Sequence, residues 1–170
     1  AQVPRGRLRG TPFTFDGQTV TGTENVMMAA ALAEGRTVLR NCAREPEVTD
    51  LAAALARMGA RIEGAGQDEI RIDGVERLRP LDHAVIPDRI EAGTFLVAGA
   101  LPGCDVTVTG CAPPDLEALV EKLRAAGAEV TGVEGGLRVR GGSRPRPTDV
   151  RTAPHPGFPT DMQAQYMVLM

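Results

Sequence analysis

Residues 46–60 read PEVTDLAAALARMGA, and residues 114–128, which lie 68 positions further along the chain, read PDLEALVEKLRAAGA. Both stretches begin with proline, which a helix accepts in its first turn, and both end in Gly-Ala. Apolar residues recur in each at the i, i+3, i+4, i+7 spacing of an amphipathic helix. The two stretches therefore predict one helix each, and their fixed spacing predicts a repeated structural unit.

The repeat extends on both sides of these helices. Each predicted unit begins with an apolar helix followed by a glycine, Gly35 or Gly103, a residue that suits a helix C-terminus. An alternating strand comes next, then the amphipathic helix, then two short strands. We expect the apolar helices over residues 26–33 and 94–101, and the strands over residues 37–43, 61–63, 69–74, 105–112, 129–131 and 137–140. A third copy, cut off at Met170, is expected to begin at Asp161.

The first helix of each unit is apolar on nearly every side. In the first copy, residues 26–32 read VMMAAAL. A helix of this kind is expected inside a protein, with sheets and amphipathic helices around it. The sequence therefore predicts an α/β fold in which repeated units surround buried apolar helices.

Composition narrows the class of protein. The 170 residues suffice for one domain or two small ones, and 42% hydrophobic with 24% charged residues is typical of a globular protein. A net charge of −3 provides no basic surface for nucleic acid. The sequence shows no signal peptide and no apolar run long enough to span a membrane, so we expect a cytoplasmic protein without a membrane partner.

The three cysteines, Cys42, Cys104 and Cys111, form no CxxC motif and no Cys/His pattern that would hold a metal. Their odd number in a chain of cytosolic character indicates reduced thiols rather than disulfides. We expect all three to be buried core residues. The sequence therefore predicts no metal site.

Residues 152–165 read TAPHPGFPTDMQAQ, and three prolines fix the backbone of this short run. Thr160 and Asp161 then open an apolar helical stretch, residues 166–170. A carboxylate held at a helix start by a rigid loop suits a group that must meet a ligand. The alternative is that Asp161 only caps the helix. His155, between two prolines, is read as a structural residue.

A second candidate site is the turn formed by Thr19, Val20, Thr21 and Gly22, directly before a predicted helix. Thr23 is the expected N-cap of that helix. Helix N-termini expose unpaired N–H groups and bind phosphate well, and small residues let an anion approach the backbone. The alternative is a simple turn from strand to helix.

A third candidate group is formed by Glu45, Asp88, Arg89 and Glu91, which follow predicted strands. These residues either point into a cleft between domains or form surface ion pairs, which contribute little. The guanidinium of Arg89 suits a phosphate.

Four stretches resemble one family, the bacterial UDP-N-acetylglucosamine enolpyruvyl transferases (UDP-N-acetylglucosamine 1-carboxyvinyltransferases). They are residues 19–25 (TVTGTEN), 41–47 (NCAREPE), 87–94 (PDRIEAGT) and 152–165, and the resemblance runs in order over essentially all 170 residues. Since the family's chains are more than twice this length, the sequence is identified as an internal fragment. The resemblance implies an inside-out α/β barrel with three repeated units in each of two domains. Residues 1–86 would be the last unit of the first domain, and residues 87–170 the first, truncated unit of the second.

The resemblance also implies a reaction. The family transfers the enolpyruvyl group of phosphoenolpyruvate to the 3-hydroxyl of UDP-N-acetylglucosamine by addition and elimination, without metal or organic cofactor. Phosphate is released, and the enolpyruvyl product enters peptidoglycan synthesis. Asp161 would be the general base for that hydroxyl, with Thr160 along the same sugar. Residues 19–22 would contact the diphosphate, and Asp88 and Arg89, with Glu45, would lie near the reacting groups.

Two alternatives stay open, and both concern the whole protein. One is a sibling enzyme that acts on shikimate 3-phosphate, and the other is a non-catalytic scaffold with the same repeat fold. The family's reactive cysteine lies in a loop upstream, and none of the three cysteines matches it, so the fragment alone is expected to be inactive. Apolar residues 166–170 suggest that it associates with a second copy or with missing segments.

Overall fold

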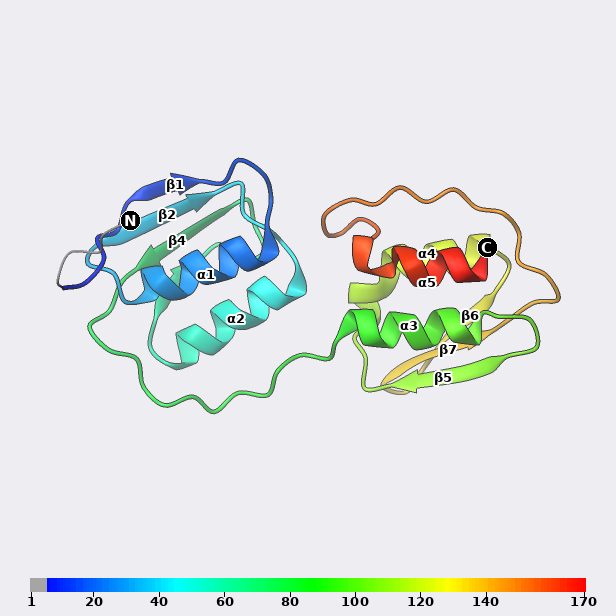
Figure 1. Ribbon diagram of the computed structural model, residues 1–170. Coiled ribbons are helices and arrows are strands. Elements are labelled where there is room, and N and C mark those ends of the chain that lie inside the picture. Colours follow the sequence, from blue (N-terminus) through cyan, green and yellow to red (C-terminus); the bar gives the residue numbers. More distant parts are fainter. Residues whose placement is uncertain (1–5) are drawn as a thin grey trace. The chain divides into compact units, whose positions relative to one another are not determined.

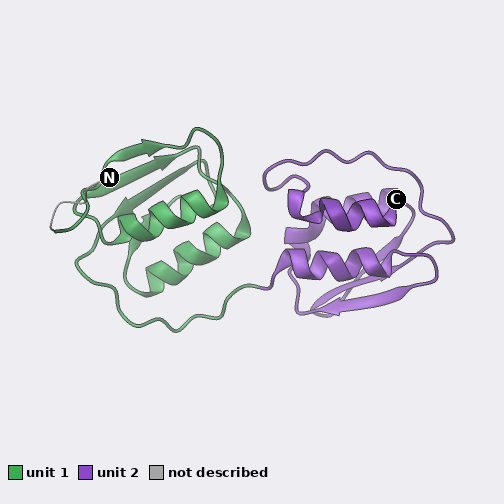
Figure 2. Ribbon diagram, in the orientation of Figure 1, with its two compact units in different colours: residues 1–86 green, residues 87–170 purple. Residues whose placement is uncertain are grey.

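The computed structural model describes residues 6–170 and divides the chain into two compact units, Ala1–Ile86 and Pro87–Met170 (Figures 1 and 2). Each unit is a layer of helices packed on one sheet. The assignment of the units to two domains of a larger enzyme stays a prediction.

Unit 1 contains β1 (Pro12–Thr14), α1 (Val20–Ala31), β2 (Arg36–Arg40), α2 (Pro46–Arg57), β3 (Arg61–Glu63) and β4 (Glu69–Asp73). The strand order in its sheet is β1-β2-β4-β3. β1 runs parallel to β2, whereas β4 runs antiparallel to both β2 and β3. α1 and α2 lie side by side on one face of this sheet (Figure 1).

Unit 2 contains α3 (Arg89–Gly99), β5 (Asp105–Thr109), the 3₁₀ turn η1 (Pro113–Leu116), α4 (Glu117–Ala125), β6 (Glu129–Val133) and β7 (Gly136–Arg140). A long loop then leads to the 3₁₀ turn η2 (Thr160–Met162) and to α5 (Gln163–Leu169). The sheet order is β5-β7-β6, with both pairs antiparallel. α3 packs on β5 and β7, and α5 packs on α3.

The predicted repeat is confirmed. The order helix–strand–helix–strand–strand recurs, and the pair β2–β4 has the same register as β5–β7: Thr37 lies opposite Ile72, and 68 positions later Asp105 lies opposite Arg140. The pair β6–β7 is shifted by one residue relative to β3–β4. The boundaries of the six predicted strands fall within three residues of those expected, since alternating apolar residues mark a half-buried strand clearly. β1 was not predicted.

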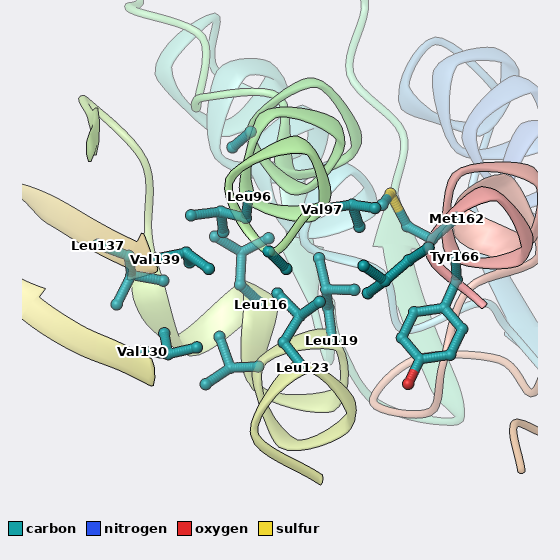
Figure 3. Close-up of a cluster of buried hydrophobic side chains, with 14 of the residues drawn as sticks. Leu96, Val97, Leu116, Leu119, Leu123, Val130, Leu137, Val139, Met162 and Tyr166 are labelled. Carbon is teal, nitrogen blue, oxygen red and sulfur yellow. The ribbon is translucent and has the colours of Figure 1, made fainter. Parts of the chain in front are cut away.

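Aliphatic side chains form the core of each unit. In unit 1, Met27, Leu39, Ile70 and Ile72 are fully buried. In unit 2, Leu96 of α3, Leu123 of α4 and Val139 of β7 are fully buried and meet between the layers (Figure 3). Burial of each such side chain stabilises the fold by about 1.5–3 kcal/mol, so these layers hold the loops at their ends in fixed positions.

Both first helices begin earlier than predicted. α1 starts at Val20 rather than residue 26, and α3 starts at Arg89 rather than residue 94. Thr23 is therefore not the N-cap: it lies inside α1 and is fully buried. Thr19 caps α1 instead, and Asp88 caps α3. The opening turns carry polar residues, so the apolar pattern alone does not reveal them.

The amphipathic helix of unit 2 also begins differently from the prediction. η1 precedes it, and α4 proper starts at Glu117 rather than Pro114. Pro113 and Pro114 lack amide hydrogens, and the tighter turn closes instead through Asp115 N–H, which donates to Ala112 O over 3.0 Å. In unit 1, where a single proline is present, α2 starts at Pro46 as predicted.

The expected burial of the first helices is only partly correct. Met28 and Leu32 at α1 and Phe95 on α3 are between 43% and 54% exposed. Each helix buries the face that meets its own sheet and neighbouring helix, and no element within residues 6–170 covers these three side chains. The inside-out barrel thus stays a prediction for the larger protein.

The expectation of three buried cysteines is wrong for one of them. Cys42 is buried and Cys111 half-buried, but Cys104 is exposed on the turn after α3. Burial raises the pKa of the Cys42 thiol to about 11. Within residues 6–170, no group of three His, Cys, Asp or Glu side chains is placed to hold a metal ion, and no helix is long and apolar enough to cross a membrane.

Candidate functional site

The first candidate group is the turn that opens α1. The Thr19 hydroxyl accepts a hydrogen bond from the Gly22 amide over 3.2 Å, and the Thr23 amide donates to Thr19 O over 3.0 Å. The helix itself leaves the amides of Val20 and Thr21 without a partner, because they have no carbonyl four residues back within the helix. These two N–H groups and the positive end of the helix dipole form a setting that suits an anion.

Gly22 is needed for this cap. A Cβ atom at residue 22 would lie 2.4 Å from Cγ2 of Thr19, which is closer than any real contact. A larger residue would displace the Thr19 side chain and with it the hydrogen bond to the Gly22 amide. The predicted group of Thr19, Val20, Thr21 and Gly22 thus forms one turn, in which two residues build the cap and two offer amides.

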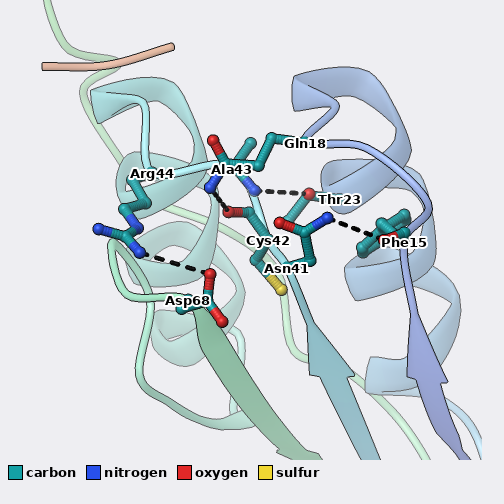
Figure 4. Close-up of polar contacts among 8 residues, drawn as sticks. All are labelled: Phe15, Gln18, Thr23, Asn41, Cys42, Ala43, Arg44 and Asp68. Carbon is teal, nitrogen blue, oxygen red and sulfur yellow. Dashed lines mark hydrogen bonds and ion pairs between the residues drawn. The ribbon is translucent and has the colours of Figure 1, made fainter. Parts of the chain in front are cut away.

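The loop after β2 is fastened to this turn by side chains (Figure 4). Asn41 adopts a positive φ of 57°, and its amide group donates to Phe15 O over 2.9 Å. The Gln18 side chain donates to Cys42 O over 3.3 Å. The Ala43 amide donates to the hydroxyl of Thr23 over 3.1 Å. Residues on both sides of the α1 start are therefore held against one loop.

Glu45 follows in the same loop, as the N-cap residue of α2, and is only 8% exposed. Its carboxylate and that of Glu47 both lie close enough to Glu24 to act on it electrostatically. Partial burial raises the pKa of Glu24, and the charges of Glu47 and Glu45 raise it further. This end of unit 1 thus carries both the open amides of α1 and a group of carboxylates.

In unit 2, Asp88 caps α3. Its Oδ1 accepts from the amides of Ile90 and Glu91 over 2.7 and 3.1 Å. This carboxylate therefore stabilises the start of α3 as its N-cap. The residue that follows it, Arg89, is the first residue of the helix. A shallow pocket of about 330 Å³ lies beside this helix start, and Asp88, Glu91, Phe95 and Cys111 are among its lining residues.

Asp161 lies within η2 and is exposed. The residues at the N-cap positions are Pro159 for η2 and Met162 for α5, and neither makes a side-chain capping bond. The interpretation of Asp161 as an N-cap is therefore wrong. The carboxylate instead accepts from its neighbour Thr160, with 3.5 Å between Oγ1 and Oδ1. It is available to a ligand.

Buried residues on both sides of Asp161 hold it in place. Phe158 is 4% exposed and packs edge-on against Tyr166, with 5.6 Å between ring centroids. Met162 is 1% exposed and lies against α3, where a Cβ atom at residue 93 would come within 3.0 Å of its sulfur. The Tyr166 hydroxyl donates to Lys122 O over 3.1 Å. Two anchored neighbours thus restrict an exposed carboxylate.

The loop before Asp161 is closed by backbone hydrogen bonds. The Ala153 amide donates to Phe158 O over 2.9 Å, and the Gly157 amide donates to Pro154 O over 2.8 Å. Thr152 and Phe158 form a parallel bridge. The Gln165 side chain donates to the Thr94 hydroxyl over 3.1 Å, which ties α5 to α3. These contacts add to the restraint that the prolines impose on the run, and its rigidity stays a prediction.

Two groups were missed by the sequence reasoning. Thr23, which the sequence predicts as a cap, is instead a buried bridge between α1 and the loop after β2. The Nε2 atom of His83 lies 2.8 Å from Oδ1 of Asp50, and both side chains are largely buried. This pair fastens the segment after β4 to α2. No sequence signal marked it, because the two residues are far apart in the chain.

A family model described as EPSP synthase (3-phosphoshikimate 1-carboxyvinyltransferase) matches residues 1–170. UDP-N-acetylglucosamine 1-carboxyvinyltransferase of Anaeromyxobacter sp. (strain Fw109-5) is 80% identical over 170 residues, which are 100% of this chain and 40% of that protein. The protein of the same name from Sorangium cellulosum (strain So ce56) is 63% identical over 166 residues, or 96% of this chain and 39% of that one. The chain thus spans about 40% of the length of these curated relatives.

Solved structures agree with this fold. The enolpyruvyl transferase NikO from Streptomyces tendae superposes with a TM-score of 0.71 at 26% identity, covering 88% of this chain and 36% of that one. EPSP synthase from Acinetobacter baumannii gives a TM-score of 0.56 at 23% identity, covering 80% and 33%. The second likeness concerns the fold alone.

Proposed function

The chain belongs to the EPSP synthase (3-phosphoshikimate 1-carboxyvinyltransferase) family, and from this membership we propose that the full-length protein is a UDP-N-acetylglucosamine enolpyruvyl transferase. It transfers the enolpyruvyl group of phosphoenolpyruvate to the 3-hydroxyl of the sugar and releases phosphate. The observation that carries the choice of acceptor is the 80% identity, over the whole chain, to relatives named for that activity. The product enters peptidoglycan synthesis in the cytoplasm.

Asp161 is proposed as the general base. Its carboxylate takes the proton of the 3-hydroxyl while the hydroxyl oxygen attacks C2 of phosphoenolpyruvate and C3 gains a proton. The tetrahedral intermediate then loses a proton from C3 and expels phosphate, which restores the double bond. The support is an exposed carboxylate that caps no helix and is held between the buried residues Phe158 and Met162.

The other candidate residues are assigned to binding. The amides of Val20 and Thr21 donate to diphosphate oxygens, in the turn that Thr19 and Gly22 build. Thr160 lies along the sugar beside the base. Arg89 binds a phosphate group through its guanidinium.

The two remaining candidates support this binding. Asp88 holds Arg89 in place by capping α3, and Glu45 contacts the reacting groups. Neither substrate requires a metal or organic cofactor in this mechanism. Residues 1–86 are assigned to the last repeat of one domain, and residues 87–170 to the first repeat of the other.

The test is release of phosphate by the full-length protein, supplied with phosphoenolpyruvate and either UDP-N-acetylglucosamine or shikimate 3-phosphate. We expect release with the nucleotide sugar only. Asp161→Asn keeps the shape of the side chain but cannot accept the proton, so kcat should fall by roughly 10²–10⁴-fold. Release with shikimate 3-phosphate would favour the sibling enzyme, and no release with either acceptor would favour the scaffold.

A further inference from the structure

Thr23 is the most completely buried polar side chain near the α1 start, with 0% of its surface exposed. Its hydroxyl donates to Thr19 O over 2.7 Å and accepts from the Ala43 amide over 3.1 Å. Both hydrogen-bonding capacities of the group are therefore used. One side chain joins the carbonyl of the cap residue of α1 to the loop that follows β2 (Figure 4).

The repeat shows that the fold does not require this bridge. The N-cap residues Thr19 and Asp88 lie 69 positions apart, so the residue of α3 that corresponds to Thr23 is Ala92, which is also buried but has no hydroxyl. In the matching loop of unit 2, the Cys111 thiol donates to Val108 O over 3.7 Å, a contact within the same segment. Both units nevertheless form the same order of helices and strands, and β2–β4 has the same register as β5–β7. The buried bridge is thus specific to the unit that carries the open amides.

Two further hydrogen bonds also join the segment around the α1 start to the loop after β2. The side chains of Gln18 and Asn41 also cross between the segment before α1 and the loop after β2. We call Gln18, Thr23 and Asn41 the clasp. Because the clasp fixes Thr19 from both sides, the amides of Val20 and Thr21 keep one direction before any ligand arrives. Donors that are already oriented bind an anion without a further ordering cost.

We propose that Thr23 is a positioning residue for the diphosphate of the nucleotide sugar. It holds the cap carbonyl of Thr19 and so aims the first amides of α1 at the phosphate oxygens, without touching the substrate. This inference rests on the proposed function. A residue with only a structural role would change the stability of the protein but would leave nucleotide affinity unchanged.

The experiment uses the full-length protein and the variants Thr23→Val, Thr23→Ser and Thr37→Val. Valine keeps the shape of threonine but removes the hydroxyl, and serine keeps the hydroxyl. Thr37 is a buried threonine of β2 in the same unit, 5% exposed, and serves as the matched control. The measurements are KM for each substrate, kcat, the Kd of uridine diphosphate by calorimetry, and the melting temperature.

For Thr23→Val we expect KM for UDP-N-acetylglucosamine and Kd for uridine diphosphate to rise about tenfold, the effect of losing roughly one hydrogen bond. In Thr23→Val, KM for phosphoenolpyruvate should stay within about twofold of the wild-type value. Every constant of Thr37→Val should also stay within about twofold of wild type, and Thr23→Ser should bind the nucleotide as the wild-type protein does. Should Thr23→Val fail to fold, Asn41→Gly decides, since glycine accepts the positive φ while the bond to Phe15 O is lost. A smaller rise in the same two constants is expected there.

This inference alone would be overturned if an active, folded Thr23→Val protein kept the wild-type KM for UDP-N-acetylglucosamine and Kd for uridine diphosphate. If the Thr23→Val protein does not fold, the same result in Asn41→Gly would overturn it. A rise of equal size in Thr37→Val would overturn it too. A wild-type protein that neither binds uridine diphosphate nor releases phosphate would overturn the proposed function, and this inference with it.

Discussion

Units 1 and 2 are two copies of one repeat, yet they offer opposite chemistry. Unit 1 presents backbone amides at the start of α1, held by the clasp. Unit 2 presents the carboxylate of Asp161 on the 3₁₀ turn η2, after the long loop that follows β7. The order helix–strand–helix–strand–strand is common to both units. The comparison teaches that the repeat supplies the scaffold and that the segments joining its elements supply the chemistry.

The shared part includes the solvent face of each sheet. In unit 1, Arg36 contacts Asp73 through two hydrogen bonds of 2.7 and 2.8 Å. In unit 2, Asp105 accepts from Arg138 and Arg140 over 2.6 and 2.8 Å. Both pairs join neighbouring strands at the same end of the repeat, and both are exposed to solvent. They belong to the scaffold.

The largest effect on stability is expected from the cores. Leu55 and Leu123 occupy corresponding positions in α2 and α4 and are 5% and 0% exposed. Replacing either with alanine in the full-length protein should cost about 2–5 kcal/mol, because a cavity remains. Hydrogen exchange measured peptide by peptide should show faster opening in the unit that carries the substitution. Equal acceleration in both units by either variant would contradict two separate cores.

An effect of intermediate size is expected in the rate at which the cysteines of the two units react with an alkylating reagent. Cys42 of unit 1 is buried with a pKa near 11, whereas Cys104 of unit 2 is exposed. With an alkylating reagent at pH 8, mass spectrometry should find Cys104 modified rapidly and Cys42 only after unfolding. Since the unfolded Cys42 thiol ionises near pH 9 and the folded one near 11, its contribution to stability should be lost as the pH rises through that range. Rapid labelling of folded Cys42 would contradict its burial.

The smallest effect is expected at the sheet surfaces. The guanidinium of Arg36 holds the pKa of Asp73 below its usual value, and those of Arg138 and Arg140 do so more strongly for Asp105. Asp73→Asn and Asp105→Asn should each lower the melting temperature slightly at neutral pH, and less at high salt.

The pH dependence of this effect has a definite sign. A carboxylate with a lowered pKa stabilises the fold above its unfolded pKa, so both differences from the wild-type protein should shrink as the pH falls below about 4. A loss as large as that of the leucine variants would show that these pairs are more than scaffold contacts.

The repeat, its strands and its amphipathic helices could be predicted because apolar spacing determines which face is buried. The starts of α1 and α3 could not, since their first turns are polar and Thr19 and Asp88 are identified as caps only by backbone geometry. The exposure of Phe95 and Cys104 depends on which elements surround them, which the local pattern does not contain.

The residues of the candidate site stay a prediction from the sequence, and the structure adds the local contacts that each of them makes. Thr19 to Gly22 are predicted as a turn and Asp161 as a carboxylate on a rigid loop. That Asp161 caps no helix, that Asp88 does, and that Thr23 bridges two segments follow only from hydrogen bonds between particular atoms. Single side-chain contacts of this kind leave no periodic signal in a sequence.

The central claim is that the α1 amides bind the nucleotide and that the Asp161 carboxylate acts in the reaction step. The most direct test of it compares Val20→Pro with Asp161→Asn in the full-length protein. Proline at residue 20 suits the first position of α1, as Pro46 does in α2, but removes one amide hydrogen. Val20→Ala, which keeps the amide, is the control.

The measurement is kcat and KM for UDP-N-acetylglucosamine in all three variants. We predict that Val20→Pro raises KM about tenfold with little change in kcat, that Asp161→Asn lowers kcat at least about 100-fold with little change in KM, and that Val20→Ala resembles the wild-type protein. A fall in kcat alone for Val20→Pro, or full activity of Asp161→Asn, would contradict the account.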